Sequence, residues 1–444
     1  MLHGDDFAFP SIYRLLQNST FKIGWKTALG LVISNMIGTG VFTSLGFQLL
    51  EVQGTWSIII LWSLGGVIAL IGAFTYAELG THFKDSGGDY IFLSRTFHPF
   101  LGYLYAWTSL TVGFSAPVAI AAMAMTDYLQ LPPDIAVYAN WISIGIIVAL
   151  AGVHTQTIRV SSRFQNYASV IKLVFVGLLI LVGFLYLPYE SNALQFDSTW
   201  SNDLWKPGFA VSLIYVTYAY QGWNSAAYIV DEIRDPRRNL PIALIGGTVV
   251  VTLVYVLLQL VFLRHASLAQ LEGQVEVASI AFANIAGDNW AKFVSYFIAI
   301  QLIATISGYL WIGSRITYAM AKEHRLWQSI AVKTEGGVPV RAIWLQVFIS
   351  SLLTLSGTFE QVMIYAGFLL QLMSTLTVAS IFFIEDKADT FKGPFGHKLQ
   401  LFYILFSIVV LSYLLYERPL ESLMGLGILV IGGASFFIKH KKPK

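Results

Sequence analysis

The chain has 444 residues, of which 56% are hydrophobic and only 12% are charged, and its mean hydropathy is +0.66. A soluble protein carries about a quarter charged residues, so these values exclude an ordinary soluble fold and point to lipid as the solvent. The net charge of +2 argues against nucleic-acid binding, and the absence of cysteine excludes disulfides, thiolate metal sites and cysteine nucleophiles.

The N-terminal segment, residues 1–24, is predicted to lie in the cytoplasm. It begins with acidic residues and lacks the basic-then-apolar pattern of a signal peptide. We therefore expect the first apolar segment to stay in the mature protein.

Twelve apolar segments follow, each close to the length of about 20 residues that a membrane-spanning helix needs. They lie near residues 25–48, 56–80, 100–130, 137–156, 163–187, 208–232, 241–264, 290–321, 340–357, 361–384, 400–416 and 421–438. We predict an all-α membrane protein with twelve transmembrane helices. Its parts are two sets of five helices, a final pair and a basic cytoplasmic tail, at residues 25–190, 207–384, 399–438 and 439–444.

The positive charges predict the orientation of these helices. With the N-terminus inside, 22 of the 27 Lys and Arg residues fall on the cytoplasmic side and four fall outside, while Lys172 lies within a span. Cytoplasmic loops attract Lys and Arg, so both chain ends are expected in the cytoplasm of a cell whose plasma membrane holds the protein.

Two of the predicted spans are interrupted at corresponding places. The first contains "SNMIGTGVF" (34–42), and the sixth contains "YVTYAYQGWNSAAY" (215–228), which puts Gln221, Gly222 and Asn224 between apolar halves. A Gly-x-Gly pair alone also permits close helix packing. Interruptions at the first helix of each five-helix set, however, are typical of a transporter site built from inverted repeats.

Such breaks have a specific chemistry. The half-helix that begins after a break offers free N–H groups and a positive dipole end, which suit a carboxylate. The carbonyl groups that end the preceding half-helix suit an ammonium group. We therefore expect these breaks to bind the head group of an amino acid, with glycine letting the backbone approach the ligand.

Lys172 is the one basic residue predicted within a span. It lies nine residues beyond Arg163, about 13 Å along the helix axis, near the middle of a hydrocarbon core about 30 Å thick. A lysine near a boundary can extend to the headgroups, but this depth exceeds its reach. The ammonium could replace a bound Na⁺ or carry a proton, and the sequence leaves both open.

Polar residues also mark the predicted cytoplasmic loops. "SGGDYIFLSRTF" (86–97) is interpreted as an in-plane helix after a Gly-Gly turn and as a candidate inner gate. Glu78 is expected near the inner end of the second span, as a boundary or a coupling carboxylate. Asn239 is predicted to cap the seventh span, with Pro241 in its first turn.

The motifs resemble those of the amino acid–polyamine–organocation superfamily. "NMIGTGVF" resembles its span-one signature, and "YAYQGWNSAAYIVDEIRDPRRNLPIAL" is similar to the span-six segment of its L-type amino acid transporters. "ELGTHFKDSGGDYIFL" and "GSRITYAMAKEHRL" are similar to further family segments, and the resemblance covers roughly residues 25–438. It implies a five-plus-five inverted repeat with helices 1 and 6 unwound mid-membrane, two additional helices, and Na⁺-independent amino acid transport, often by exchange.

The resemblance also implies roles for individual residues. Those expected at the substrate site are Ile37, Gly38, Thr39, Gly40, Tyr218, Ala219, Gln221, Gly222 and Asn224. Ile37, Thr39 and Gly40 would receive the carboxylate, whereas the backbone of Ile37, Tyr218 and Ala219 would hold the ammonium group. Tyr218 would close over the substrate, and Lys172 would stand where Na⁺-coupled relatives bind an ion.

Three departures from the family pattern affect these expectations. Gln221 stands where relatives usually have Gly, Ala or Ser, so it should narrow the pocket or bind a substrate side chain. Ser225 replaces a tyrosine found in many relatives. The loop after the third span lacks the cysteine through which animal relatives attach a glycoprotein, so no disulfide-linked heavy chain is expected.

The leading hypothesis is exchange of neutral amino acids, because the predicted pocket contains no carboxylate to pair with a cationic side chain. A proton-coupled symporter of amino acids or polyamines is the alternative, and a nutrient receptor without transport is a more distant one. None of the eight His residues is predicted mid-span, and neither an enzyme nor a channel fits the pattern. No cofactor or metal is expected.

Overall fold

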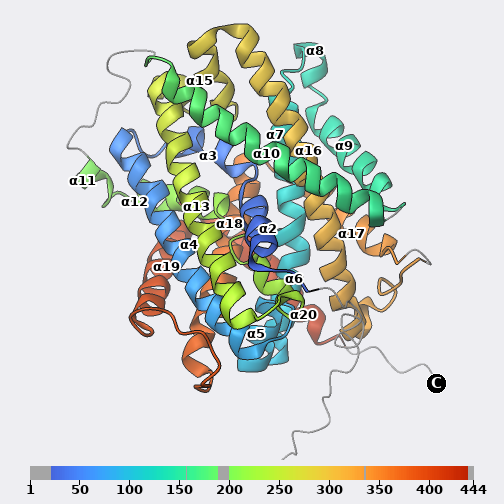
Figure 1. The fold of residues 1–444 in the computed structure, drawn as a ribbon. Coiled ribbons are helices and arrows are strands. Elements are labelled where there is room, and N and C mark those ends of the chain that lie inside the picture. Colours follow the sequence, from blue (N-terminus) through green and yellow to red (C-terminus); the bar gives the residue numbers. More distant parts are fainter. Residues whose placement is uncertain (1–21, 157, 189–199, 335–336, 439–444) are drawn as a thin grey trace, which may run out of the picture.

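The computed structural model describes residues 22–156, 158–188, 200–334 and 337–438, with side chains in the α10 helix from Val170 onward. Most of the predicted N-terminal segment, residues 1–24, and all of the basic tail, residues 439–444, lie outside the described residues. Within the described part all regular elements are helices (Figure 1), and one isolated β-bridge pairs Ile23 with Ile233.

The described residues before position 188 form ten helical elements. In order they are α2 (Trp25–Met36), α3 (Gly40–Gln48), α4 (Thr55–Phe83), α5 (Asp89–Thr96), α6 (Pro99–Thr108), the π-helical η1 (Ser109–Phe114), α7 (Ser115–Tyr128), α8 (Pro133–Ala136), α9 (Ala139–His154) and α10 (Ile158–Leu185).

The second half begins with α11 (Trp200–Asp203), α12 (Pro207–Ala219) and the 3₁₀ segment η2 (Ser225–Glu232). It continues with α13 (Pro236–His265), α14 (Leu268–Leu271), α15 (Val277–Ala286), α16 (Asp288–Glu323) and η3 (Arg325–Trp327). The last elements are α17 (Val340–Ser356), α18 (Phe359–Ala379), η4 (Ser380–Phe383), α19 (Lys398–Glu417) and α20 (Pro419–Phe436).

Eight helical stretches of the described chain are long and apolar enough to cross a membrane. They are Trp25–Gln48, Thr55–Phe83, Pro99–Tyr128, Pro236–His265, Asp288–Lys322, Phe359–Phe383, Lys398–Glu417 and Pro419–Phe436. The other four predicted spans fall on α9, α10, α12 with η2, and α17. The prediction of a multi-pass, all-helical membrane protein is therefore confirmed.

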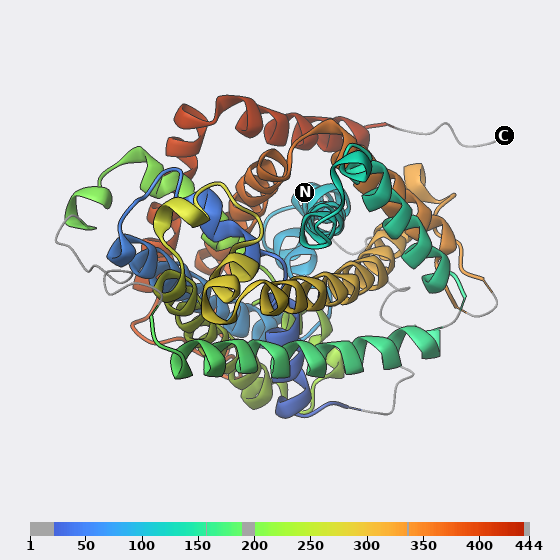
Figure 2. The same cartoon turned by 90° about the horizontal axis from the view of Figure 1, so that it is seen from above.

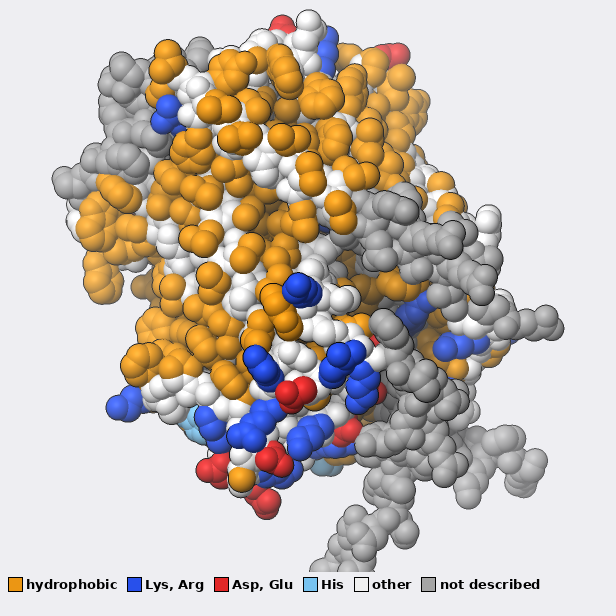
Figure 3. Space-filling model, viewed as in Figure 1, with side chains coloured by type: hydrophobic (Ala, Val, Ile, Leu, Met, Phe, Trp, Pro, Cys, Tyr) orange, Lys and Arg blue, Asp and Glu red, His pale blue; other side chains and the backbone are white. Residues whose placement is uncertain are grey.

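The helices form a bundle around α3, in which every residue from Gly40 to Gln48 is buried. Viewed from above, α10 follows one edge of this bundle and α20 follows the opposite edge (Figure 2). The peripheral helices expose large apolar side chains, such as Trp141 (63%), Phe348 (60%) and Val430 (70%). This apolar face covers the upper part of the molecule, whereas charged side chains gather at the lower end, as expected of a protein surrounded by lipid (Figure 3).

The start of α13 differs from the prediction. The helix begins at Pro236 rather than after Asn239, and Pro241 lies inside it. The Asn239 side chain donates to the Arg234 carbonyl oxygen instead of capping the helix. Proline fits the first turn, where its missing N–H has no helical partner, and Pro236 occupies that position.

Candidate functional site

The junction between α2 and α3 consists of Ile37, Gly38 and Thr39. Ile37 has an extended conformation (φ −72°, ψ 99°), although its N–H still donates to the Ile33 carbonyl oxygen at 3.1 Å. Gly40 then begins α3, and a Cβ atom added to it would lie 2.6 Å from Cα and Cβ of Ala219. Only glycine lets the two backbones approach this closely.

A second junction connects α12, which ends at Ala219, to η2, which begins at Ser225. Gly222 within it has φ +104°, a conformation that favours glycine. A Cβ atom on Gly222 would lie 2.7 Å from the Asn35 carbonyl oxygen, in the last turn of α2. The two junctions, far apart in sequence, therefore lie against each other.

Tyr255 of α13 joins the two helix ends. Its hydroxyl lies 2.5 Å from the Met36 carbonyl oxygen and 3.0 Å from the Ala219 carbonyl oxygen. These carbonyls belong to the last residues of α2 and α12, and helix-end carbonyls lack an intrahelical partner. The side chain is fully buried, so Tyr255 satisfies acceptors that water does not reach. Sequence analysis missed it, because a tyrosine in an apolar helix carries no local signal.

Lys172 lies beside the first junction. Its ammonium nitrogen is 2.8 Å from the Ile37 carbonyl oxygen and 3.3 Å from the Thr305 hydroxyl of α16. Only 4% of the residue is exposed. A buried cation needs hydrogen-bond partners to offset its lost hydration. Here those partners are neutral, and together they connect α10, the α2–α3 junction and α16.

The N-terminus of α3 points to the chemistry of the first junction. The first N–H groups of a helix have no intrahelical partner and carry a partial positive charge. Carbonyl oxygens in the first turn are occupied, because Thr39 accepts from Thr43 at 3.0 Å and Gly40 accepts from Ser44 at 2.5 Å. This end of α3 is therefore suited to a negatively charged group.

The predicted site residues divide into two groups. Ile37, Gly38, Thr39, Gly40, Ala219 and Gly222 lie at the contacting junctions, with Tyr218 buried in the last turn of α12 and Gln221 partly buried in the turn that follows. The Asn224 amide instead lies 3.4 Å from a carboxylate oxygen of Asp89 on α5 and 3.3 Å from the Tyr228 hydroxyl.

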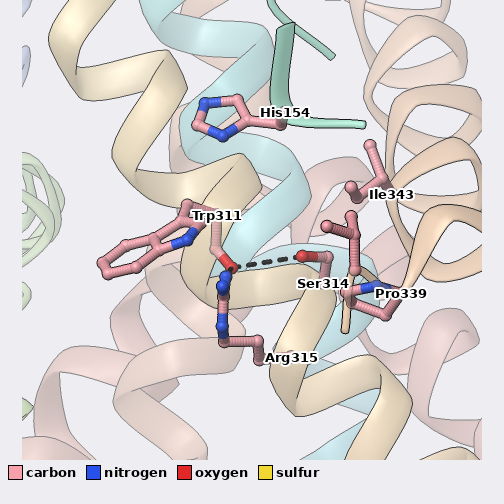
Figure 4. Close-up of a pocket in the computed structure, with 7 residues that line it drawn as sticks. His154, Trp311, Ser314, Arg315, Pro339 and Ile343 are labelled. Carbon is pink, nitrogen blue, oxygen red and sulfur yellow. Dashed lines mark hydrogen bonds between the residues drawn. The ribbon is translucent and has the colours of Figure 1, made fainter. Parts of the chain in front are cut away.

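A small cavity of about 10 Å³ lies away from these junctions, between α9, α16 and the start of α17 (Figure 4). Arg315 donates to the Trp311 carbonyl oxygen at 2.6 Å and stacks over the indole ring, and Ser314 donates to the same carbonyl. The volume is that of roughly one water molecule. The cavity is therefore too small for an organic substrate.

Comparison with known proteins finds similarity over almost the whole chain. The profile of a family described as "Amino acid permease" matches residues 23–428. The chain is 26% identical to b(0,+)-type amino acid transporter 1 of Mus musculus, over 90% of this chain and 83% of the relative. It is 25% identical to Asc-type amino acid transporter 1 of Mus musculus, over 95% of this chain and 82% of the relative. It is 27% identical to large neutral amino acids transporter small subunit 2 of Oryctolagus cuniculus, with the same two coverages.

Proposed function

Because the chain belongs to the amino acid permease family, we propose that it exchanges neutral L-amino acids across the membrane without Na⁺. The family resemblance predicted from the sequence is confirmed, and the protein is an amino acid transporter rather than an enzyme. We propose further that transport occurs by exchange and that the substrates are neutral.

The proposed architecture is a set of twelve transmembrane helices. In it, α2 to α10 form the first inverted repeat, α12 to α18 form the second, and α19 and α20 are additional. The α2–α3 and α12–η2 junctions are then mid-membrane breaks of the first and sixth helices. The charge distribution of the sequence supports cytoplasmic chain ends and a plasma-membrane location.

The proposed substrate head group lies at the two junctions. Its carboxylate accepts hydrogen bonds from the start of α3, around Thr39 and Gly40. Its ammonium group is held by the carbonyl oxygens of Ile37, Tyr218 and Ala219. Lys172 and Tyr255 already donate to two of these carbonyls, but a carbonyl oxygen has two lone pairs and can accept a second donor.

The contact between Lys172 and Ile37 carries the proposal of Na⁺ independence. An ammonium group 2.8 Å from the carbonyl oxygen at the break supplies the positive charge that a bound Na⁺ would supply. The charge is covalently part of the protein, so it remains in place throughout a transport cycle. A transporter with this arrangement needs no Na⁺ to stabilise the break.

The proposed neutral substrate follows from the charges near the junctions. Among the described residues, no Asp or Glu belongs to the segments 37–40 and 218–222. A cationic side chain would find no counter-charge there, and its burial would be costly. The chain also lacks cysteine, so we propose that it works without a disulfide-linked heavy chain.

Proton-coupled symport is the second candidate, and one observation favours it. Both hydrogen-bond partners of Lys172 are neutral, so a rearrangement of the junction would allow the ammonium group to lose a proton. In that case Lys172 carries the coupling ion instead of replacing one. A receptor that binds amino acids without moving them is a more distant alternative.

Reconstitution in liposomes tests the proposal. The purified protein is placed in vesicles loaded with unlabelled neutral amino acids, or left empty, without Na⁺. Uptake of a labelled neutral amino acid only into loaded vesicles is the expected result. Uptake into empty vesicles that grows with an inward proton gradient would establish symport, and tight binding without flux would establish a receptor.

A further inference from the structure

A buried carboxylate lies on α5, outside the two junctions. Asp89 is fully buried, and it accepts hydrogen bonds from the hydroxyl of Tyr76, from the hydroxyl of Tyr228 at 2.8 Å and from the amide of Asn224 at 3.4 Å. The Tyr105 hydroxyl is in turn hydrogen-bonded to that of Tyr228. We call these five residues the Asp89 cluster. They join α4, α5, α6 and the α12–η2 region.

The carboxyl group of Asp89 is compensated by hydrogen-bond donors and not by a cation. Among the described residues, Asp89 forms no ion pair with a Lys, Arg or His. Burial raises the pKa of its carboxyl group, and the hydrogen bonds from Tyr76 and Tyr228 oppose this increase. The hydroxyl and amide donors therefore replace the water molecules that would bind a carboxyl group at the surface. Each donor that is lost leaves a buried carboxyl oxygen without a partner.

The loop before Asp89 is attached to the same part of η2. The Gly87 N–H donates to the Tyr228 carbonyl oxygen at 3.2 Å, and the Ser86 hydroxyl donates to Asp231. Gly88 has φ +54°, and a Cβ atom on it would lie 2.7 Å from the Tyr228 ring. A residue with a side chain at this position would push the loop away from η2, so the close contact depends on glycine.

The η2 segment is less regular than the long helices around it. It is a 3₁₀ helix with a kink at Ile229 (φ −129°, ψ 33°), and 3₁₀ hydrogen bonds are weaker than those of an α-helix. Its far end also holds the start of α2, because the Ile23 N–H donates to Glu232 and the Arg234 N–H donates to Ile23, each at 2.9 Å. If η2 shifted away from α5, the residues that lead into α2 would therefore move with it.

We propose that Asp89 is the positioning residue that closes the cytoplasmic side of the transport pathway, by holding η2 against α4, α5 and α6. The proposal rests on the proposed exchange function, and it takes that exchange to occur by alternating access, in which the site opens to one side of the membrane at a time. The substrate does not touch Asp89 in this scheme, and Asn224 acts through the cluster. Breaking the cluster frees η2 and opens this end, and the opposite end does not become more exposed.

The cysteine-free chain allows a direct test by thiol labelling. Ala227, next to Tyr228, and Ala278 of α15 are both fully buried. Helix α15 lies at the end of the molecule opposite α5 (Figure 1). Each is replaced separately by cysteine, and the protein is placed in lipid nanodiscs, where a soluble maleimide reaches both faces. The labelling rate of each introduced cysteine is then compared with and without Asp89→Asn.

Asp89→Asn is expected to raise the labelling rate of the cysteine introduced by Ala227→Cys about tenfold, because it replaces one accepting carboxyl oxygen with an amide group that donates, so that at least one donor of the cluster loses its acceptor. The labelling rate for Ala278→Cys should not rise, and Asp89→Glu should keep most of the closure. Asp85→Asn is the matched control, since it removes a carboxylate from the same loop that pairs with Arg95 outside the cluster. It should leave both rates unchanged.

An unchanged rate for Ala227→Cys in well-folded Asp89→Asn protein would overturn the proposal, and so would an equal rise at both cysteines, which indicates general loosening. If Asp89→Asn does not fold, Tyr228→Phe replaces it, and a rise of several-fold at Ala227→Cys alone is expected. No rise there would equally overturn the proposal. Labelling needs no substrate, so a failure to exchange amino acids would reject the proposed function separately.

Discussion

The ammonium nitrogen of Lys172 lies 2.8 Å from the carbonyl oxygen of Ile37. This contact joins the middle of α10 to the point where α2 ends, and the Thr305 hydroxyl completes it from α16. The position of the α2–α3 junction therefore depends in part on the Lys172 side chain, which is itself held by two neutral groups.

Replacing Lys172 by alanine should slow exchange at least about tenfold, because a hydrogen bond to a charged group contributes about 1.5–3 kcal/mol. Added Na⁺ should partly restore the variant and leave the parent protein unchanged, since the cation would occupy the place of the ammonium group. Initial exchange rates in liposomes, with and without Na⁺, measure both effects. Lys292→Ala, which removes an exposed lysine from α16, is the control and should behave as the parent. Undiminished exchange in Lys172→Ala would contradict the role given to this residue.

Tyr255→Phe should destabilise the protein by about 1–2 kcal/mol, because it leaves two buried carbonyl oxygens without their shared donor. The ring keeps its edge contacts with Trp62 and Tyr220, so the change isolates the hydroxyl. Exchange should also slow, as the ends of α2 and α12 lose their common attachment. Thermal unfolding in detergent and exchange in liposomes test the two effects. Tyr413→Phe, at a partly exposed position of α19, should change neither.

The apolar pattern of the sequence predicted most of the long helices, because length and hydropathy alone decide whether a segment suits a bilayer. It also located Lys172 far from the helix ends. The sequence pattern could not identify the partners of Lys172, because its contact with Thr305 joins residues that are 133 positions apart in the chain. Tyr255 was missed for the same reason, as its two acceptors lie on distant helices.

Asn224 shows a further limit of sequence patterns. Its place in the interrupted segment suggested the substrate site, but the pattern does not tell which way the side chain points. In the structure the amide donates toward Asp89 and Tyr228. The start of α13 was predicted incorrectly for a similar reason. Pro236 and Pro241 both suit the first turn of a helix, and the sequence pattern does not tell which of them begins it.

Gly222→Ala should reduce both stability and exchange. The residue has φ +104°, where a side chain costs about 1–3 kcal/mol, and the new Cβ would approach the Asn35 carbonyl oxygen to 2.7 Å. The α12–η2 junction would have to move away from α2, which separates the two halves of the proposed site. The melting temperature and the exchange rate of the variant test this prediction.

The matched control is Gly145→Ala in α9. A Cβ atom at that position meets nothing within 4 Å, so the stability of this variant should stay the same or rise slightly. Equal effects of the two substitutions would contradict the prediction.

His324, just beyond the end of α16, should make stability depend on pH. Burial lowers the pKa of its imidazole to about 4, below the value of about 6.5 expected in the unfolded chain. Between these two values the unfolded state binds a proton that the folded state does not, so stability should fall as the pH decreases from about 6.5 to about 4. The neutral imidazole ring packs edge-on against the ring of Tyr103, with 4.4 Å between the ring centroids.

Melting temperatures of the parent protein and of His324→Gln, measured between about pH 6.5 and about pH 4, test the prediction. The variant should show a shallower decrease, because one group no longer takes up a proton on unfolding, and identical slopes would mean that His324 is already protonated in the folded protein.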